Sequence, residues 1–195
     1  MYTETGSIKG LQDIEHMGIT TKSIDACNLH MTGESIDRIF IKGKLVDEIH
    51  SHNLIVNSFL NLAMCLLKQQ NGYTGLQYWA VGSGASSWDA TPVTPDIKAT
   101  RLTSEIGRVA LTSDCFSFLN SNYEVVSTPS NILQVKRTFK ENECNGVWRE
   151  FGIFGGNATS ALNSGIMINK RHHGVITKTN EMTVERIMRF VLNLV

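Results

Sequence analysis

Apolar and polar residues mostly alternate with a period of two from about residue 108 onward. In Ile132–Phe139, Leu133 and Val135 fall on one face, and polar residues occupy much of the other. Alternation of this kind is typical of a strand with one buried face. It predicts strands at 132–139, 147–154 and 165–169, with turns at Gly155-Gly156-Asn157 and Asn163-Ser164-Gly165.

The last segment of the chain, residues 182–192, fits two different periodicities. Its apolar positions 184, 187, 188, 191 and 192 fit a helix face, whereas 182, 184, 188, 190 and 192 fit one face of a strand. Arg186 is the exception on that strand face. The β-branched content and the strand-rich region before it favour a strand.

A hairpin and a helix are predicted before residue 72. The extended runs 36–41 and 44–56 flank Lys42-Gly43, which is a good turn. Asn57 resembles a helix cap, and apolar residues follow at 59, 62, 63 and 66, with a stop signal at Asn71-Gly72. We therefore expect one helix near 58–69, with Leu62 in the core.

Residues 1–35 have a different pattern and are predicted to form an N-terminal arm or extension. Their apolar residues are spaced too irregularly for a helix or a strand, so we expect the arm to lie on the body or on a neighbouring subunit. These are Ile8, Leu11, Ile14, Met17 and Ile19. Residues 36–195 are expected to be mainly β, most simply an antiparallel β-sandwich with one buried α-helix.

Composition excludes several classes of protein. The 195 residues include 18 basic and 18 acidic side chains, and this zero net charge argues against a general nucleic-acid binder. No apolar run approaches the ~20 residues of a membrane span, and residues 1–10 lack a secretory-signal pattern. Four cysteines, at 27, 65, 115 and 144, form no CxxC pair, which favours free thiols in a reducing compartment and leaves a disulfide open.

Motifs for common catalytic sites are missing from the sequence. Gly82-Ser83-Gly84 has neither the third glycine of a dinucleotide site nor the Lys-Ser/Thr of a P-loop, and no Gly-x-Ser-x-Gly nucleophile elbow is present. His50 and His52 share one face of a predicted strand, but no third ligand completes a metal site. We therefore expect no cofactor and no metal.

Carboxylates are the remaining route to an enzyme. Glu141, Glu143 and Glu150 lie close in sequence, and paired carboxyl groups hydrolyse glycosides. A cluster around a predicted turn is more typical of a solvated surface, and no apolar pocket is marked beside it. We expect the chain not to be an enzyme, and retain a small hydrolase acting through Glu141 or Glu150 only as a competing hypothesis.

The segment 82–108 contains two other candidate features. Residues 82–100 are rich in Ser, Thr and Pro, as in a surface loop, and include Trp88 in a polar setting. Trp88 either stacks on a sugar ring or pins the loop to the protein or to a neighbour, and the second role is the commoner one. Glu105 and Arg108 are expected to form a polar clamp that closes this loop, by pairing with each other or by facing different neighbours.

Five strings occur in an order that resembles a group of tailed-bacteriophage structural proteins. The resemblance covers residues 40–192 and leaves residues 1–35 outside it. The strings are His52-Asn53-Leu54-Ile55-Val56-Asn57, Trp79-Ala80-Val81-Gly82-Ser83-Gly84, Leu102-Thr103-Ser104-Glu105-Ile106-Gly107-Arg108, Asn145-Gly146-Val147-Trp148-Arg149-Glu150-Phe151-Gly152-Ile153-Phe154 and Ile176-Thr177-Lys178-Thr179.

The resemblance implies a virion component of the tail, baseplate, neck or collar, or of the capsid surface, with no catalytic role and no cofactor. Its partners would be copies of itself and other virion proteins, with no nucleic acid and no membrane, and it would be assembled in the host cytoplasm. The motif residues then serve as turn glycines and as a buried structural clamp of Glu105, Arg108 and Glu150. The alternative is a glycan- or receptor-binding β-sandwich on a fibre or tail tip, with Trp88 as the interacting residue.

Overall fold

The computed structural model describes residues 29–90 and 93–194, most of which lie in ten β-strands, with a single α-helix among the described residues. Two short 3-10 turns, Ser86–Asp89 and Ser113–Cys115, lie in the connections. The elements are β1 (Leu29–Ile41), β2 (Lys44–Ile55), α1 (Ser58–Leu67), β3 (Thr74–Gly82), β4 (Glu105–Ala110), β5 (Phe116–Leu119), β6 (Val125–Val126), β7 (Ile132–Phe139), β8 (Gly146–Gly156), β9 (Ile166–Lys178) and β10 (Met182–Leu194).

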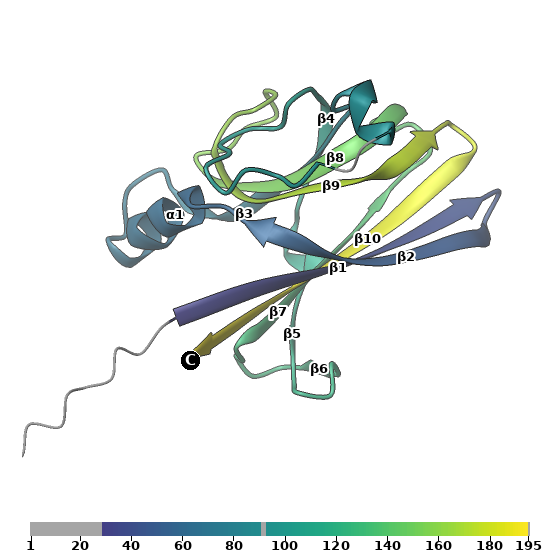
Figure 1. Cartoon of the computed structure of the whole chain (residues 1–195). Coiled ribbons are helices and arrows are strands. Elements are labelled where there is room, and N and C mark those ends of the chain that lie inside the picture. The colour runs from purple at the N-terminus through teal and green to yellow at the C-terminus, as the bar shows by residue number, and fades with distance from the viewer. Residues whose placement is uncertain (1–28, 91–92, 195) are drawn as a thin grey trace, which may run out of the picture.

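All strand pairs are antiparallel, in the order β4-β3-β8-β9-β2-β1-β10-β7-β5-β6. β2 pairs with β1 over most of its length but meets β9 only through Leu54 and Ile55. This short contact divides the sheet into two halves. One half contains β4, β3, β8 and β9, and the other contains β2, β1, β10, β7, β5 and β6. In Figure 1, β8 and β9 lie above β1 and β10.

The two halves of the sheet pack face to face across one hydrophobic core. Phe139 of β7 packs edge-on against Trp79 of β3, with ring centroids 6.4 Å apart, and against Trp148 of β8 at 5.0 Å. Such aromatic contacts add to the stabilisation that burial alone provides. The mainly β, antiparallel fold with one helix is therefore confirmed, with the sandwich made by one sheet folded over on itself.

The hairpin between β1 and β2 forms at the predicted turn. Lys42 and Gly43 both have positive φ angles, 49° and 78°, which suits a two-residue hairpin connection. β1 begins at Leu29, so residues 29–35 of the predicted arm belong to the sheet instead. They pair with β10 at the other end of the chain, a partner that local sequence does not reveal. The rest of the predicted arm, residues 1–28, lies outside the described residues.

The predicted helix is present, but it is shorter and less buried than expected. It ends at Leu67, before the predicted stop at Asn71-Gly72, and Asn57 makes no side-chain capping hydrogen bond. Leu62 is its one buried residue, at 1% exposed, because α1 lies at one end of the sandwich, where its contacts are mainly with β9.

The ambiguous final segment is a strand, as predicted, and β10 lies between β1 and β7. Along the described part of the chain, no helix has the length and apolar character needed to cross a membrane.

Candidate functional site

Glu105 and Arg108 form a buried, two-pronged ion pair on β4. Arg108 Nε donates to Glu105 Oε1 at 2.6 Å, and Nη2 donates to Oε2 at 2.9 Å. Residues three apart on a regular strand point to opposite faces. Here Glu105 pairs with Gly82 while Gly107 pairs with Val81, so one extra residue bulges between them. The bulge brings both side chains to one face.

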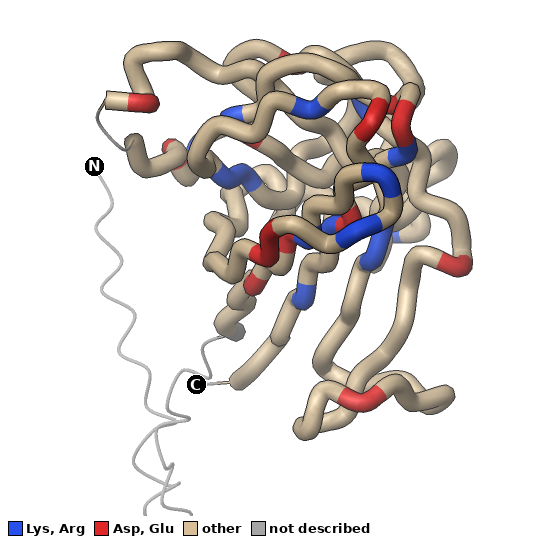
Figure 2. Tube along the Cα trace, turned by 90° about the vertical axis from the view of Figure 1, so that its right-hand side faces the viewer, with Lys and Arg blue, Asp and Glu red and all other residues tan. Residues whose placement is uncertain are grey.

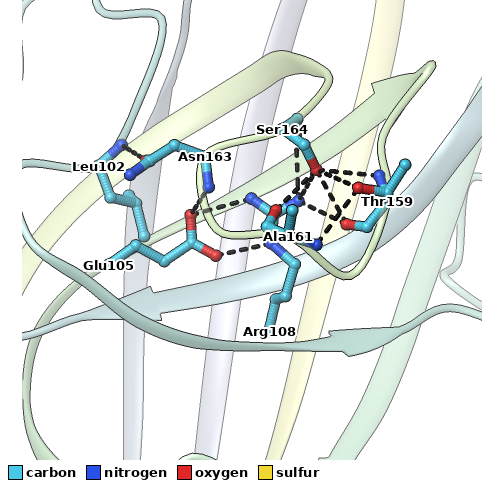
Figure 3. Close-up of polar contacts among 7 residues, drawn as sticks. All are labelled: Leu102, Glu105, Arg108, Thr159, Ala161, Asn163 and Ser164. Atoms are coloured by element: carbon cyan, nitrogen blue, oxygen red, sulfur yellow. Dashed lines mark hydrogen bonds and ion pairs between the residues drawn. The ribbon is translucent and has the colours of Figure 1, made fainter.

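This pair ties β4 to the loop between β8 and β9 (Figure 3). Arg108 Nη1 donates to the carbonyl oxygens of Thr159 and Ser164, at 3.0 and 3.1 Å. Glu105 Oε2 accepts a hydrogen bond from the backbone N–H of Asn163 at 2.7 Å. The guanidinium also lies 4.7 Å from the ring centroid of Phe154. Because these groups are hydrogen-bonded, the cost of burying their charges is offset.

Glu150 of β8 holds the segment that leads into β4. Its carboxylate is fully buried and accepts hydrogen bonds from the backbone N–H groups of Ser104 at 2.8 Å and Thr103 at 3.0 Å. Lys170 Nζ lies 3.1 Å from Oε2. A Cβ on Gly82 would lie 2.7 Å from Oε1, so a side chain there would displace the carboxylate. Glu150 is thus a buried anchor, as expected of a structural clamp with Glu105 and Arg108, and it does not share the solvated setting expected for a cluster with Glu141 and Glu143.

The other two carboxylates of that sequence cluster lie on the turn before β8. Glu143 accepts a hydrogen bond from Arg137 Nη2 at 2.9 Å, while Glu141 is exposed. Nearby, Lys178 Nζ donates to the Glu141 carbonyl oxygen at 3.2 Å and to Asn145 Oδ1 at 2.8 Å. Burial lowers the pKa of Lys178. Asn145 and Lys178 belong to two of the five strings named in the sequence analysis, and this contact joins them.

Trp88 lies in the 3-10 turn Ser86–Asp89 and packs mainly against its own chain. Its ring stacks on His172, with centroids 3.8 Å apart. A Cβ on Gly84 would lie 2.4 Å from Cζ3, so the glycine backbone lies against the ring. Asp89 accepts two hydrogen bonds from Arg149, both at 2.8 Å. These contacts fix the loop to β8 and β9.

A depression of about 410 Å³ lies beside Trp88 and is also lined by Asp89, Val93, His172 and His173. Burial is the main cause that lowers the pKa of both histidines, and for His173 the value falls to about 4. The depression thus combines an aromatic ring, a carboxylate and two imidazoles whose charged forms are disfavoured.

The remaining histidine and cysteine candidates lie apart from these contacts. His50 pairs with Glu48 at 2.7 Å on the exposed side of β2, and within 29–90 and 93–194 no three His, Cys, Asp or Glu side chains cluster as metal ligands do. Cys65, Cys115 and Cys144 are free thiols. Burial raises the pKa of Cys144 to about 11, which disfavours its reactive thiolate form.

Sequence reasoning missed an apolar groove of about 500 Å³ at the end of the sandwich where α1 lies, here called the end groove. Seven segments of the chain contribute to it, and no single stretch of sequence signals it. Its lining residues are Met31, Phe59, Leu62, Leu66, Gly75, Leu76, Phe116, Ser130, Asn131, Leu133, Ile168, Phe190 and Leu192.

The outward side of α1 is a second feature that the sequence analysis did not anticipate. Leu60, Met64 and Leu67 are 62%, 62% and 76% exposed. They are four and three residues apart, so they form one helical stripe, here called the α1 face. The apolar residues whose spacing predicted the helix were expected to pack in the core, but α1 carries apolar residues on more than one side.

Comparison with known proteins adds no family to this description. Neither a protein-family model nor a curated protein sequence matches the chain.

In the view of Figure 2, basic and acidic residues are interspersed along the trace.

Proposed function

We propose that the chain is a structural component of a tailed-phage virion that acts by packing against copies of itself and against other virion proteins. The α1 face carries this proposal. Large apolar patches on a protein surface typically mark interaction sites. Full burial of an exposed apolar side chain of this size contributes roughly 1.5–3 kcal/mol. The three side chains of the α1 face are already partly buried, so each would contribute less than that towards the cost of association.

The phage-like motif residues support the same proposal through the contacts that they make. Glu105, Arg108 and Glu150 join strands and loops that are distant in sequence, as do Asn145 and Lys178. These contacts stiffen the body of the protein, and a rigid body loses less conformational entropy when it packs into an assembly. The zero net charge also leaves little electrostatic repulsion between copies.

The proposal is tested by placing charges on the α1 face in the full-length chain. In the Leu60→Glu, Leu67→Glu double variant, we expect self-association to weaken at least tenfold in light-scattering titrations and incorporation into particles to fall. The matched control is Val125→Glu on β6, where the side chain is 68% exposed and far from α1 in the sheet order. Equal association of the double variant, the control and the parent chain would exclude the α1 face as the assembly surface.

Glycan or receptor binding is a second candidate function, favoured by the depression beside Trp88. Aromatic rings combined with carboxylates suit sugar recognition, but the stacking of Trp88 on His172 occupies one face of this ring. A glycan array followed by calorimetry tests this candidate. Loss of a detected signal in Trp88→Leu, with unchanged melting temperature, supports it. The absence of any signal for the parent chain rules against it.

A further inference from the structure

The end groove is a part of the hydrophobic core that the described residues leave open. Leu62, Ile168 and Phe190 line the groove and also belong to the main core cluster. The groove is bounded by α1, β3 and β9 on one side and by β1, β10, β7 and β5 on the other. An apolar occupant would therefore contact both halves of the sandwich and extend the packing of the core between them.

We infer that residues 8–19 of this chain occupy the end groove. The first reason is the place where the described chain begins. β1 starts at Leu29, and Met31 lines the groove together with Leu192, its partner across the β1–β10 pair. The chain before Leu29 is thus attached at the rim of the groove.

The second reason is the length of the tether. Nine residues, 20–28, separate Ile19 from Leu29. They span at most about 30 Å when extended, and about 16 Å on average as a random coil. Tethers of this length give effective concentrations in the millimolar range, so even weak apolar contacts keep the groove filled.

The third reason is chemical complementarity. The groove is lined by apolar groups apart from Ser130 and Asn131. The segment supplies apolar side chains two or three residues apart, with polar and charged residues between them that remain in contact with water. The apolar residues are Ile8, Leu11, Ile14, Met17 and Ile19.

The segment reaches the groove of its own chain directly, and it reaches the groove of a neighbour when copies pack together. In either arrangement the same apolar contacts form, and exchange of an identical element between copies is a low-cost route to association. The identity of the occupant therefore does not depend on the α1 face being the assembly surface.

Photo-cross-linking of the full-length chain tests the inference. The photoreactive residue p-benzoylphenylalanine replaces Leu66 at the rim of the groove, and irradiated protein is digested and analysed by mass spectrometry. We expect cross-links to peptides within residues 8–19. The same residue at Val125, which is exposed on β6, is the matched control and should give no such links. Mixing ¹⁵N-labelled and unlabelled chains shows whether the links lie within one chain or between two.

Links to residues 8–19, within or between chains, support the assignment. Links that map only to other segments, or a small apolar molecule released from the groove and detected by native mass spectrometry, overturn it. A second measurement avoids the photoreactive residue: in Leu11→Glu, Ile14→Glu, hydrogen exchange of the α1 amides should rise at least tenfold, whereas Gln12→Glu should leave it unchanged. Equal exchange in both variants also overturns the assignment. Leu60 and Leu67 lie on the α1 face and do not line the end groove. Their glutamate variants therefore test the assembly surface alone, and the cross-links and exchange rates test the occupant of the groove alone.

Discussion

Asp37 and Arg186 face each other directly across the β1–β10 pair and form an ion pair buried from solvent. Arg186 donates through Nε and Nη2 to the two carboxylate oxygens of Asp37. Its guanidinium also lies 4.1 Å from the ring centroid of Phe151 on β8. The pair therefore joins the terminal strand to β1 and packs against the opposite half of the sandwich.

Breaking this pair should strongly destabilise the fold. Asp37→Asn leaves the Arg186 guanidinium buried without its counter-charge, which typically costs about 3–5 kcal/mol. We expect a loss of that size in the free energy of unfolding measured in urea. The double variant Asp37→Leu, Arg186→Met removes both charges and should lose less than either single variant.

The exposed Lys42–Glu181 pair is the matched control, since its side chains are largely solvent-exposed and its atoms lie 3.6 Å apart. Glu181→Gln should change the free energy of unfolding by less than about 0.5 kcal/mol, as is usual for surface pairs. If Asp37→Asn were as mild as Glu181→Gln, the buried pair would not be a major stabilising contact.

The strands were the most predictable part of the fold. The predicted alternation is clearest in β10, where residues 184, 186, 188 and 190 are all buried. Arg186, the polar exception on that face, is buried because it pairs with Asp37 on the neighbouring strand. The extent of β1 was not predictable, because residues 29–35 are fixed by pairing with β10 across more than 150 positions of sequence. The limited burial of α1 was not predictable either, because an apolar stripe does not show whether it packs inside the chain or against another molecule.

The candidate site was predictable only in its individual residues. Spacing suggested that Glu105 and Arg108 were a pair, but the bulge that aligns them depends on the register of β4 against β3. Sequence proximity grouped Glu150 with Glu141 and Glu143, although the predicted strand 147–154 contains only Glu150. Its bonds to the backbone N–H groups of Thr103 and Ser104 were not predictable, because those residues lie more than 40 positions away. The end groove has no local signal at all, as its lining is contributed by segments from both halves of the sheet.

Leu62 should be the residue of α1 on which monomer stability depends most. Leu62→Asp places an unpaired charge in the core and should unfold the protein or lower its melting temperature by many degrees. Leu60→Asp, two residues earlier on the exposed side, is the control and should leave thermal melting of the monomer nearly unchanged. Equal melting of the two variants would contradict the position of α1 against the core.

The Glu105–Arg108 pair should control the loop between β8 and β9. Arg108→Met retains the packing on Phe154 but removes the donors to Thr159 and Ser164, and it leaves Glu105 with a buried, partly unpaired charge. We expect a loss of about 3 kcal/mol in the free energy of unfolding. Hydrogen exchange should also become faster at the Asn163 amide, which donates to Glu105.

Lys136→Met, which removes the partly exposed ion pair with Glu185, is the matched control for loss of a cation. It should leave the exchange of the loop amides unchanged. Slow exchange at Asn163 in both variants would show that the loop is held by other contacts.

His173 should make the fold less stable in mild acid. Burial, reinforced by the positive charge of Arg186, lowers the pKa of His173 to about 4 from its ordinary 6.5. Between these two values the unfolded chain binds more protons at this position than the folded chain, so the free energy of unfolding decreases as the pH falls. This loss in the free energy of unfolding is nearly absent above about pH 6.5, reaches roughly 2 kcal/mol at pH 5, and approaches about 3 kcal/mol near pH 4.

Urea unfolding of the parent chain and of His173→Gln at pH 7.5, 6 and 5 measures this loss. His30→Gln, at an exposed histidine of β1, is the control. We expect the decrease from pH 7.5 to pH 5 to be roughly 2 kcal/mol smaller in His173→Gln than in the parent chain or in the control. A decrease of the same size in all three proteins would show that His173 is not the group responsible.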